Sequence, residues 1–194
     1  MKAGRLDYLW LKWRAITCLV FGRTRLAQGC FDAMLARWPD DTYALASRAH
    51  LLTQAGETAR ALADSERLIA LRPDDARAWF NHGYMLEASG QWEAALAAFQ
   101  RSTQLSPQLD RAWYGQGLVL IRLQRFDEAV VALKKNTELQ PMSPHGWYQL
   151  ARVHVDRQAP EEAVKIIRHL RGFEPKVAAQ LERETGLLAE KAAL

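Results

Sequence analysis

The chain has 194 residues, of which 49% are hydrophobic and 25% are charged, a composition that excludes an intrinsically disordered or fibrous protein. Its two cysteines exclude a disulfide framework, and no segment approaches the roughly 18 consecutive apolar residues of a membrane-spanning helix. We therefore predict a soluble cytoplasmic protein. The formal net charge is only +4, yet the first thirty residues carry one acidic side chain, Asp7, against six basic ones. These basic residues are Lys2, Arg5, Lys12, Arg14, Arg23 and Arg25.

Two residue types recur every 34 residues along the chain. The prolines at this spacing are Pro39, Pro73, Pro107, Pro141 and Pro175. The alanines at the same spacing are Ala27, Ala61, Ala95, Ala129 and Ala163. A fixed period of this length predicts an array of like units, none of which buries its apolar face without stacking on its neighbours. Arrays of this kind serve as binding surfaces far more often than as enzymes.

The period divides the chain into a lead-in at residues 1–7, five units, and a C-terminal capping helix at 178–194. The five units are 8–41, 42–75, 76–109, 110–143 and 144–177. Each unit has two apolar-periodic stretches of roughly a dozen residues around a central break, which predicts a helix, a short turn and a second helix. The breaks carry Gly22, Gly56, Gly90, Gln124 and Gln158.

Polar residues stand just before four of the predicted first helices. They are Asp7, Asp41, Asp75 and Ser143, and a side-chain oxygen at such a position accepts a hydrogen bond from an unpaired backbone N–H of the helix start. Pro144 follows Ser143 at the position that favours proline. After the fifth unit, the apolar residues Val177, Leu181 and Leu188 alternate with charges such as Glu190 and Lys191, which predicts an amphipathic helix over the exposed end of the array.

The central unit resembles the tetratricopeptide repeat (TPR), a family of 34-residue helical hairpins with the pattern W-x2-L-G-x2-Y, then A, F and P. Its matching residues are Trp79, Gly83, Leu86, Ala95, Phe99 and Pro107. The next unit matches with Trp113, Gly117, Leu120, Ala129, Leu133 and Pro141. The resemblance covers residues 8–177. It implies an all-α, right-handed superhelical solenoid whose first helices line an inner, concave groove.

In this family the groove positions are the second, fifth, ninth and twelfth residues of each unit. The predicted peptide-binding residues in units three to five are Arg77, Phe80, Tyr84, Arg111, Tyr114, Leu118, His145, Tyr148 and Arg152. Among them, Phe80, Tyr114 and Tyr148 form an aromatic ladder beside a cationic ladder of Arg77, Arg111 and His145. Aromatic and cationic side chains together suit an extended peptide with acidic and apolar residues. The alternative is that these aromatic residues pack against neighbouring units.

The sequence has no glycine-rich phosphate loop, paired CxxC or nucleophile elbow, so we expect a protein that is not an enzyme and uses no cofactor and no metal. His82 and His154 fall at inward positions of their helices and are expected to be hydrogen-bonded core residues. Cys18 and Cys30 lie in the two helices of the first unit and are expected to be small buried residues rather than a redox pair.

These observations predict a non-catalytic interaction module or scaffold that holds a peptide of a protein partner, with an assembly or secretion chaperone as one variant. No small-molecule substrate is expected, and the oligomeric state stays open. The alternative function is a peripheral adaptor whose basic N-terminal unit docks on an anionic membrane surface or on nucleic acid. A third interpretation of that unit is a solvated face of a terminal repeat, with Trp10 and Trp13 partly exposed.

Overall fold

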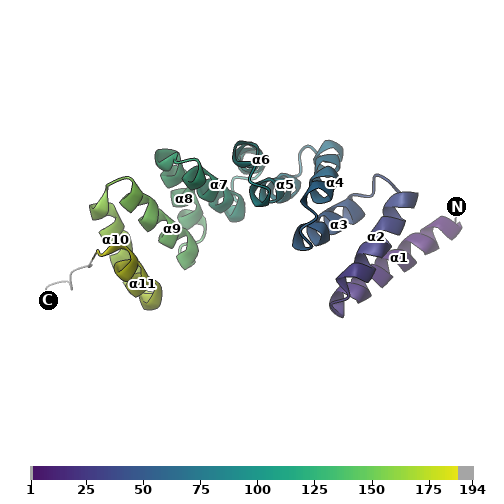
Figure 1. Cartoon of the computed structure of the whole chain (residues 1–194), viewed down its shortest axis with the longest axis horizontal. Helices are drawn as coiled ribbons and strands as arrows, with labels where there is room; N and C mark the ends of the chain where they lie inside the picture. The colour runs from purple at the N-terminus through teal and green to yellow at the C-terminus, as the bar shows by residue number, and fades with distance from the viewer. Residues whose placement is uncertain (1, 188–194) are drawn as a thin grey trace. The chain divides into compact units, whose positions relative to one another are not determined.

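The computed structural model describes residues 2–187, which form helices joined by short turns and contain no strand within that range (Figure 1). The helices fall into two compact parts, Met1–Gly90 and Gln91–Leu194. The first part contains α1 (Lys2–Val20), α2 (Thr24–Arg37), α3 (Thr42–Gln54), α4 (Thr58–Leu71) and α5 (Ala76–Ala88). The second part contains α6 (Trp92–Leu105), α7 (Asp110–Arg122), α8 (Phe126–Leu139), α9 (Pro144–Asp156), α10 (Pro160–Arg171) and α11 (Pro175–Thr185).

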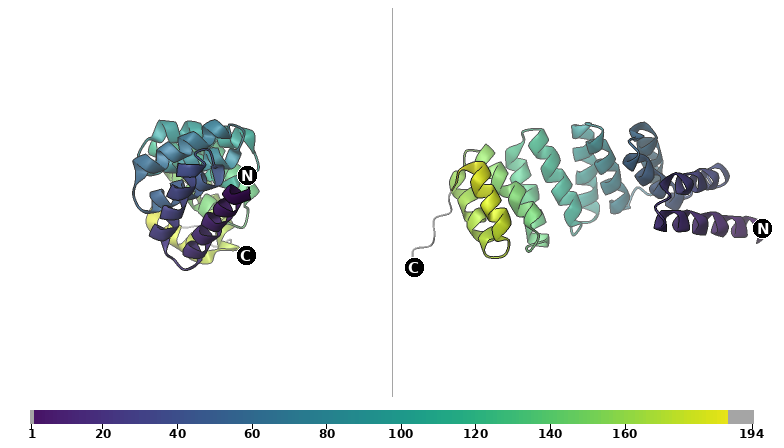
Figure 2. Two further views of the ribbon diagram at one scale, coloured as in Figure 1. Left: turned by 90° about the vertical axis from the view of Figure 1, so that its right-hand side faces the viewer. Right: turned by 60° about the horizontal axis from the view of Figure 1, so that its bottom comes forward.

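Within each part, helices that follow one another in the chain pack side by side (Figure 2). The predicted hairpins α1–α2 and α3–α4 of the first part, and α7–α8 and α9–α10 of the second part, are each in contact. Each second helix also packs on the first helix of the next unit, as α2 does on α3 and α8 does on α9. In the second part, α9 additionally contacts α7 and α11. Each part therefore contains two helical hairpins of the kind that the period predicts.

The turn inside each unit requires a left-handed backbone conformation at one residue. The residue at the predicted break has a φ of 66° at Gly22, 77° at Gly56, and 58° at both Gln124 and Gln158. Glycine adopts this conformation without a steric cost, whereas the Cβ of another residue crowds the following carbonyl oxygen. The two glutamine turns therefore keep the geometry of the glycine turns at a cost in stability.

A hydrogen bond between tryptophan and proline explains two of the repeating positions. The indole Nε1 of Trp79 donates to the carbonyl oxygen of Pro73 at 2.8 Å. Trp113 and Trp147 donate in the same way to Pro107 and Pro141, each at 2.9 Å. The tryptophan at the start of a first helix thus satisfies a backbone acceptor in the turn before it, while its ring packs in the half-buried space between units.

Small residues at the third position of a unit allow the helices of neighbouring units to approach closely. This position holds Ala44, Ala78, Ala112 and Gly146 in units two to five, and all four are buried. A Cβ added to Gly146 would collide with Oδ1 of Asn136 on α8. The backbone of each of these first helices therefore leaves no room for a large side chain toward the preceding second helix.

An ion-pair network around Arg48 joins three helices of the first part, and the repeat pattern does not predict it. The Arg48 guanidinium on α3 donates to both carboxylate oxygens of Asp64 on α4 at 2.7 Å and to Asp32 on α2 at 2.8 Å. Asp64 is buried. The hydrogen bonds to Asp64 are the largest cause that raises the pKa of Arg48, so the guanidinium is charged at every pH at which the protein is folded.

The predicted helix starts are confirmed at two sites and wrong at a third. Asp41 accepts a hydrogen bond from the backbone N–H of Ala44, and Asp75 accepts from Arg77 and Ala78. Asp7 is not a cap, because α1 begins at Lys2 and Asp7 lies inside it, bonded to Arg37 at 2.6 Å. The helix extends through the predicted lead-in.

The fifth unit begins and ends differently from the simplest expectation. Ser143 stands at the helix start, but its side chain makes no capping hydrogen bond, and Pro144 occupies the first turn of α9 as predicted. Pro175 lies in the first turn of α11 instead of at the end of the fifth unit. Proline is favoured there because the backbone N–H that it lacks would have no partner within the helix. The terminal helix therefore covers Pro175–Thr185. Leu188, Glu190 and Lys191 of the predicted 178–194 helix lie outside the described residues.

We expect Gln124→Gly and Gln158→Gly to raise the free energy of unfolding by about 0.5–1 kcal/mol each. Glycine removes the strain of the left-handed conformation, and its greater loss of conformational entropy on folding cancels part of this gain. Urea denaturation followed by circular dichroism measures the change. The matched control is Gly56→Gln, which should destabilise by a similar amount. Equal midpoints for all three variants would contradict the assigned strain.

We also expect Gly117→Ala to destabilise the protein by about 1–3 kcal/mol through overpacking. A Cβ at this position would lie 2.7 Å from two side-chain carbons of Leu133. Gly29→Ala is the matched control, because nothing lies within 4 Å of a Cβ built there and alanine favours the helix. Thermal unfolding should therefore shift in opposite directions for the two variants. A shift in the same direction would show that the helix contact is not close-packed.

Candidate functional site

The candidate site is the exposed face of the first helices, and in the second part it is carried by α7 and α9. Arg111 is exposed on α7, while Tyr114 and Leu118 are half-buried beside it. On α9, His145 and Arg152 are exposed and Tyr148 is half-buried. Since α7 and α9 are in contact, the structure places these six predicted residues on neighbouring helices. None of them is a fully buried core residue, which leaves their polar atoms accessible.

The predicted groove residues of α5 belong to the first part and are described separately. Arg77 is exposed, Phe80 is half-buried, and Tyr84 has 52% of its surface exposed. Their side chains share one face of α5 at the spacing of one helical turn. A continuous ladder from Phe80 to Tyr114 and Tyr148 remains a prediction, because these residues lie in different parts of the chain.

The terminal helix supplies a carboxylate to the groove face of α9. The hydroxyl of Tyr148 donates to Oε2 of Glu184 at 2.5 Å, and Arg152 lies 3.8 Å from the same oxygen. Gln180 donates to the other carboxylate oxygen at 2.8 Å. The hydrogen bond from Tyr148 is the largest cause that lowers the pKa of Glu184. A tyrosine and an arginine one turn apart therefore form a carboxylate-binding pair on this surface.

A small hollow adjoins this pair between α9 and α11. It has a volume of about 300 Å³ and is lined by Pro144, His145, Tyr148, Val177 and Gln180. Sequence reasoning predicted the α9 residues but missed Gln180 and Glu184. The spacing of Tyr148 and Glu184 in the sequence could have predicted their contact. The two are 36 residues apart, close to one repeat, so α11 takes the place that the first helix of a next unit would have beside α9.

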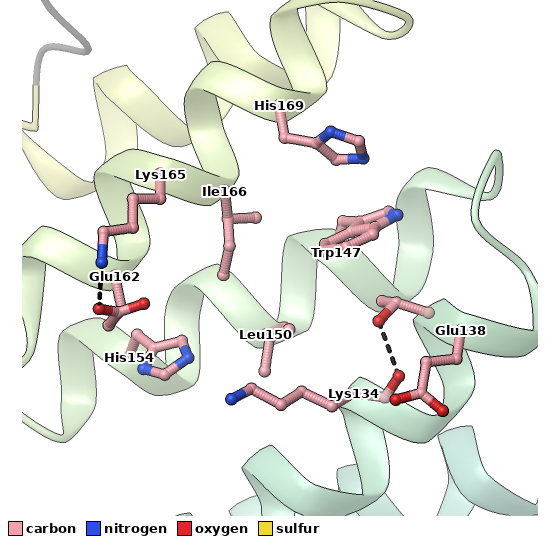
Figure 3. Close-up of a pocket in the computed structure, with 10 residues that line it drawn as sticks. Lys134, Glu138, Trp147, Leu150, His154, Glu162, Lys165, Ile166 and His169 are labelled. Atoms are coloured by element: carbon pink, nitrogen blue, oxygen red, sulfur yellow. Dashed lines mark hydrogen bonds and ion pairs between the residues drawn. The ribbon is translucent and has the colours of Figure 1, made fainter.

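A second hollow of about 390 Å³ is lined by side chains of α8, α9 and α10 (Figure 3). Its apolar lining comes from Trp147, Leu150 and Ile166, and the ring of His169 lies 4.5 Å from that of Trp147. Its charged lining comes from both sides: Lys165 pairs with Glu162 at 2.6 Å, and Lys134 extends into the hollow from α8. This hollow therefore combines an apolar lining with charged side chains of both signs.

The two inward histidines differ in how their polar atoms are satisfied. The buried His82 confirms the prediction, because its Nδ1 lies 2.8 Å from the hydroxyl of Ser65. The prediction is wrong for His154, whose buried Nδ1 has no hydrogen-bond partner within the described part of the chain. His154 occupies the position of Leu52, Leu86 and Leu120 in the preceding units, so a polar ring replaces a core leucine.

The surroundings of both histidines favour the neutral imidazole over the charged one. Burial lowers the pKa of His154 below its ordinary value of 6.5, the positive charge of Arg157 lowers it further, and Glu162 opposes this effect. Burial is also the largest cause that lowers the pKa of His82. The remaining imidazoles are exposed, as at His50, where the ring lies 3.0 Å from Gln54.

Two of the predicted basic residues of the N-terminal unit lie over aromatic rings, and three others are exposed. Lys12 lies over the ring of Tyr43, with its ammonium 4.4 Å from the ring centre. Arg14 lies over the ring of Trp10 at 5.0 Å. Arg5 is exposed on α1, and Arg23 and Arg25 are exposed where α1 turns into α2. The side chain of Lys2 lies outside the described residues.

Metal-binding clusters and membrane-spanning helices are absent from the described part of the chain. Residues 4–187 contain no group of three or more metal-binding side chains, and none of the described helices has the length and apolarity to cross a bilayer. Cys18 and Cys30 are free thiols. Burial is the largest cause that raises the pKa of Cys30, which keeps that thiol protonated and weakly nucleophilic.

Comparison with known proteins identifies the repeat. The profile of the tetratricopeptide repeat matches residues 50–113, and a second profile of the same description matches residues 114–173. No curated protein matches the sequence.

Several solved structures share the fold at low sequence identity. MamA (residues 41 to the end) from Desulfovibrio magneticus RS-1 is 20% identical, with a TM-score of 0.79 over 93% of this chain and 98% of that one. YrrB, a TPR protein with an unusual peptide-binding site, is 17% identical, with a TM-score of 0.75 over 87% and 88% of the two chains. The thermophilic TPR protein TTC0263 from Thermus thermophilus is 20% identical, with a TM-score of 0.66 over 93% and 100%.

We expect His154→Leu to raise the free energy of unfolding by about 1–3 kcal/mol at pH 7.5, because it removes an unsatisfied polar atom from the core. The substitution should also reduce the loss of stability in acid. Because the folded protein lowers the pKa of His154, the unfolded chain binds the extra proton first, and stability falls as the pH drops below about 6.5.

Urea titrations at pH 7.5 and pH 5 measure both effects. His82 keeps part of the pH dependence in the His154→Leu variant, so the slope should become smaller without vanishing. His50→Gln is the control, because it replaces an exposed imidazole instead of a buried one and should leave the stability at pH 7.5 unchanged. A less stable His154→Leu protein would mean that the imidazole has a structural partner.

Proposed function

Since the chain belongs to the tetratricopeptide repeat family, a family of protein–protein interaction modules, we propose that it is a non-catalytic scaffold that binds an extended peptide of a protein partner on the face of its first helices. The observation that carries this proposal is the contact of Tyr148 and Arg152 with the Glu184 carboxylate. It supports the view that this face recognises acidic side chains through tyrosine and arginine donors.

The neighbouring helix α7 also carries an arginine and a tyrosine, and their side-chain donors have no acceptor among the described residues. The side chains of Arg111 and Tyr114 make no hydrogen bond or ion pair within the part of the chain that the structure describes. Leu118 adds apolar surface one turn further along. A peptide with an acidic residue followed by an apolar one matches this series of side chains. The unusual peptide-binding site of YrrB, a protein of the same fold, is in keeping with peptide recognition by such an array.

The narrower role that we infer is that of an assembly or secretion chaperone in the cytoplasm. A groove that holds an extended segment keeps a client from aggregating until the client reaches its final partner, and it needs no catalytic group, cofactor or small-molecule substrate. The two free thiols suit a reducing compartment. This role requires that the client segment carry the acidic and apolar side chains that α7 and α9 recognise.

The test begins with a displayed library of random peptides selected on the full chain. An enriched peptide is labelled, and its affinity is measured by fluorescence anisotropy. We expect Arg111→Ala with Tyr114→Ala to weaken binding at least tenfold, with about 1–2 kcal/mol for each truncated contact. Circular dichroism should show a folded variant, because neither residue is buried in the core.

The matched control is Val131→Ala with Arg168→Ala, which removes one exposed apolar side chain and one exposed guanidinium from the second helices α8 and α10. This control should bind the peptide as the unmodified protein does. If the Arg111→Ala, Tyr114→Ala protein is folded and keeps its affinity, the first-helix face is not the peptide site.

A further inference from the structure

Helix α1 has apolar residues on two opposite sides, and only one of them is covered. Tyr8, Leu11, Ala15 and Cys18 pack into the core of the first part with α2 and α3. The opposite side carries an exposed apolar stripe that continues into the turn after the helix. We define this α1 stripe as Leu6, Leu9, Trp10, Trp13, Val20 and Phe21.

The exposure of the α1 stripe is large. Trp10 is 59% exposed, Trp13 is 65% exposed, and Val20 and Phe21 at its end are 76% and 73% exposed. Most of the large apolar side chains that are exposed in the described part of the chain lie in this first hairpin. A concentration of exposed apolar side chains of this kind on a folded protein marks an interaction site.

The register of the repeat shows that the stripe is not a stacking face for another hairpin. Trp10 is the third residue of its unit, where the other units have buried Ala44, Ala78, Ala112 and Gly146. In the fifth unit even a Cβ on Gly146 would collide with Oδ1 of Asn136. Thr17 is likewise exposed where later units bury Leu51 or Val119. An indole at Trp10 therefore blocks the contact that joins consecutive units.

The charges beside the stripe identify its chemical partner. On a helical projection, Arg5 and Lys12 lie about a quarter turn to one side of the stripe, and Arg14 lies about a quarter turn to the other side. Arg23 and Arg25 follow at the turn where the stripe ends. When the stripe faces an apolar layer, cations on both flanks lie at the boundary of that layer.

We propose that the α1 stripe docks this protein on an anionic lipid membrane, independently of the peptide groove. The stripe lies along the surface, with Trp10 and Trp13 at the boundary between headgroups and acyl chains, where indole rings are favoured. Arg5 and Arg14, which are exposed, then contact anionic headgroups, each adding to the attraction. The helix lies on the membrane and does not cross it.

A second copy of the chain fits this face less well than a lipid surface does. Two stripes facing one another would bring Arg5, Lys12 and Arg14 of each copy together, with Asp7 as the one acidic residue among the first thirty. Asp7 is itself paired with Arg37. Like charges at a dimer interface repel, whereas an anionic surface neutralises all the cations at once.

Co-sedimentation of the full chain with vesicles tests the proposal. The probes are vesicles of phosphatidylcholine alone and vesicles of an equal mixture of phosphatidylcholine and phosphatidylglycerol. We expect binding to the mixed vesicles, a blue shift of the tryptophan emission on binding, and weakening by salt. Trp10→Ser with Trp13→Ser, and separately Arg5→Gln with Arg14→Gln, should each lower the partition coefficient at least about tenfold.

The matched control is Val131→Ser with Met142→Ser, which removes two equally exposed apolar side chains from the second part and should leave vesicle binding unchanged. Sedimentation equilibrium without lipid distinguishes a dimer. The proposal is overturned if the unmodified chain does not bind the anionic vesicles, or if the folded Trp10→Ser, Trp13→Ser protein binds them equally well. It is also overturned if the chain self-associates without lipid and this double substitution makes it monomeric.

Discussion

The fold depends on one geometric constraint, the close approach of each first helix to the second helix before it. At Gly146 a Cβ would collide with Asn136 of α8, and at Ala44 and Ala112 the methyl group is fully buried. Only at this separation do large side chains on either side of the contact, such as Phe31 and Phe99, become buried as well. The small residue at the third position is therefore what allows one continuous core within each part.

The same constraint applies to the exposed side of α1. Trp10 stands at the third position of the first unit, and its indole is too large for the contact that Ala44 makes in the next unit. The corresponding side of α1 is exposed and apolar, and stacking of a further hairpin does not explain that apolar character. The cations at Arg5 and Arg14 supply an explanation, because they pair an apolar surface with a preference for anions.

Features that repeat were predictable from the sequence, and features that occur once were not. The 34-residue period placed the helices and even the turns at Gln124 and Gln158, because a turn of fixed geometry recurs wherever the unit recurs. The ion pairs of Arg48 with Asp64 were not predicted, because no other unit has an acidic residue at the position of Asp64. The contact of Tyr148 with Glu184 was not predicted, because it depends on how α11 packs on α9. A sequence pattern within one unit carries no information on that packing.

In the peptide complex that we propose, the Glu184 contact also determines which side chains add affinity. At Tyr148 and Arg152 an acidic peptide residue must displace a carboxylate that already accepts the same donors, so the exchange replaces one contact with a similar one. At Arg111 and Tyr114 the proposed peptide would instead make side-chain contacts that the free protein lacks. In that complex the α7 residues would contribute most of the net binding energy. Helix α9 would favour peptides whose acidic residue competes well with Glu184.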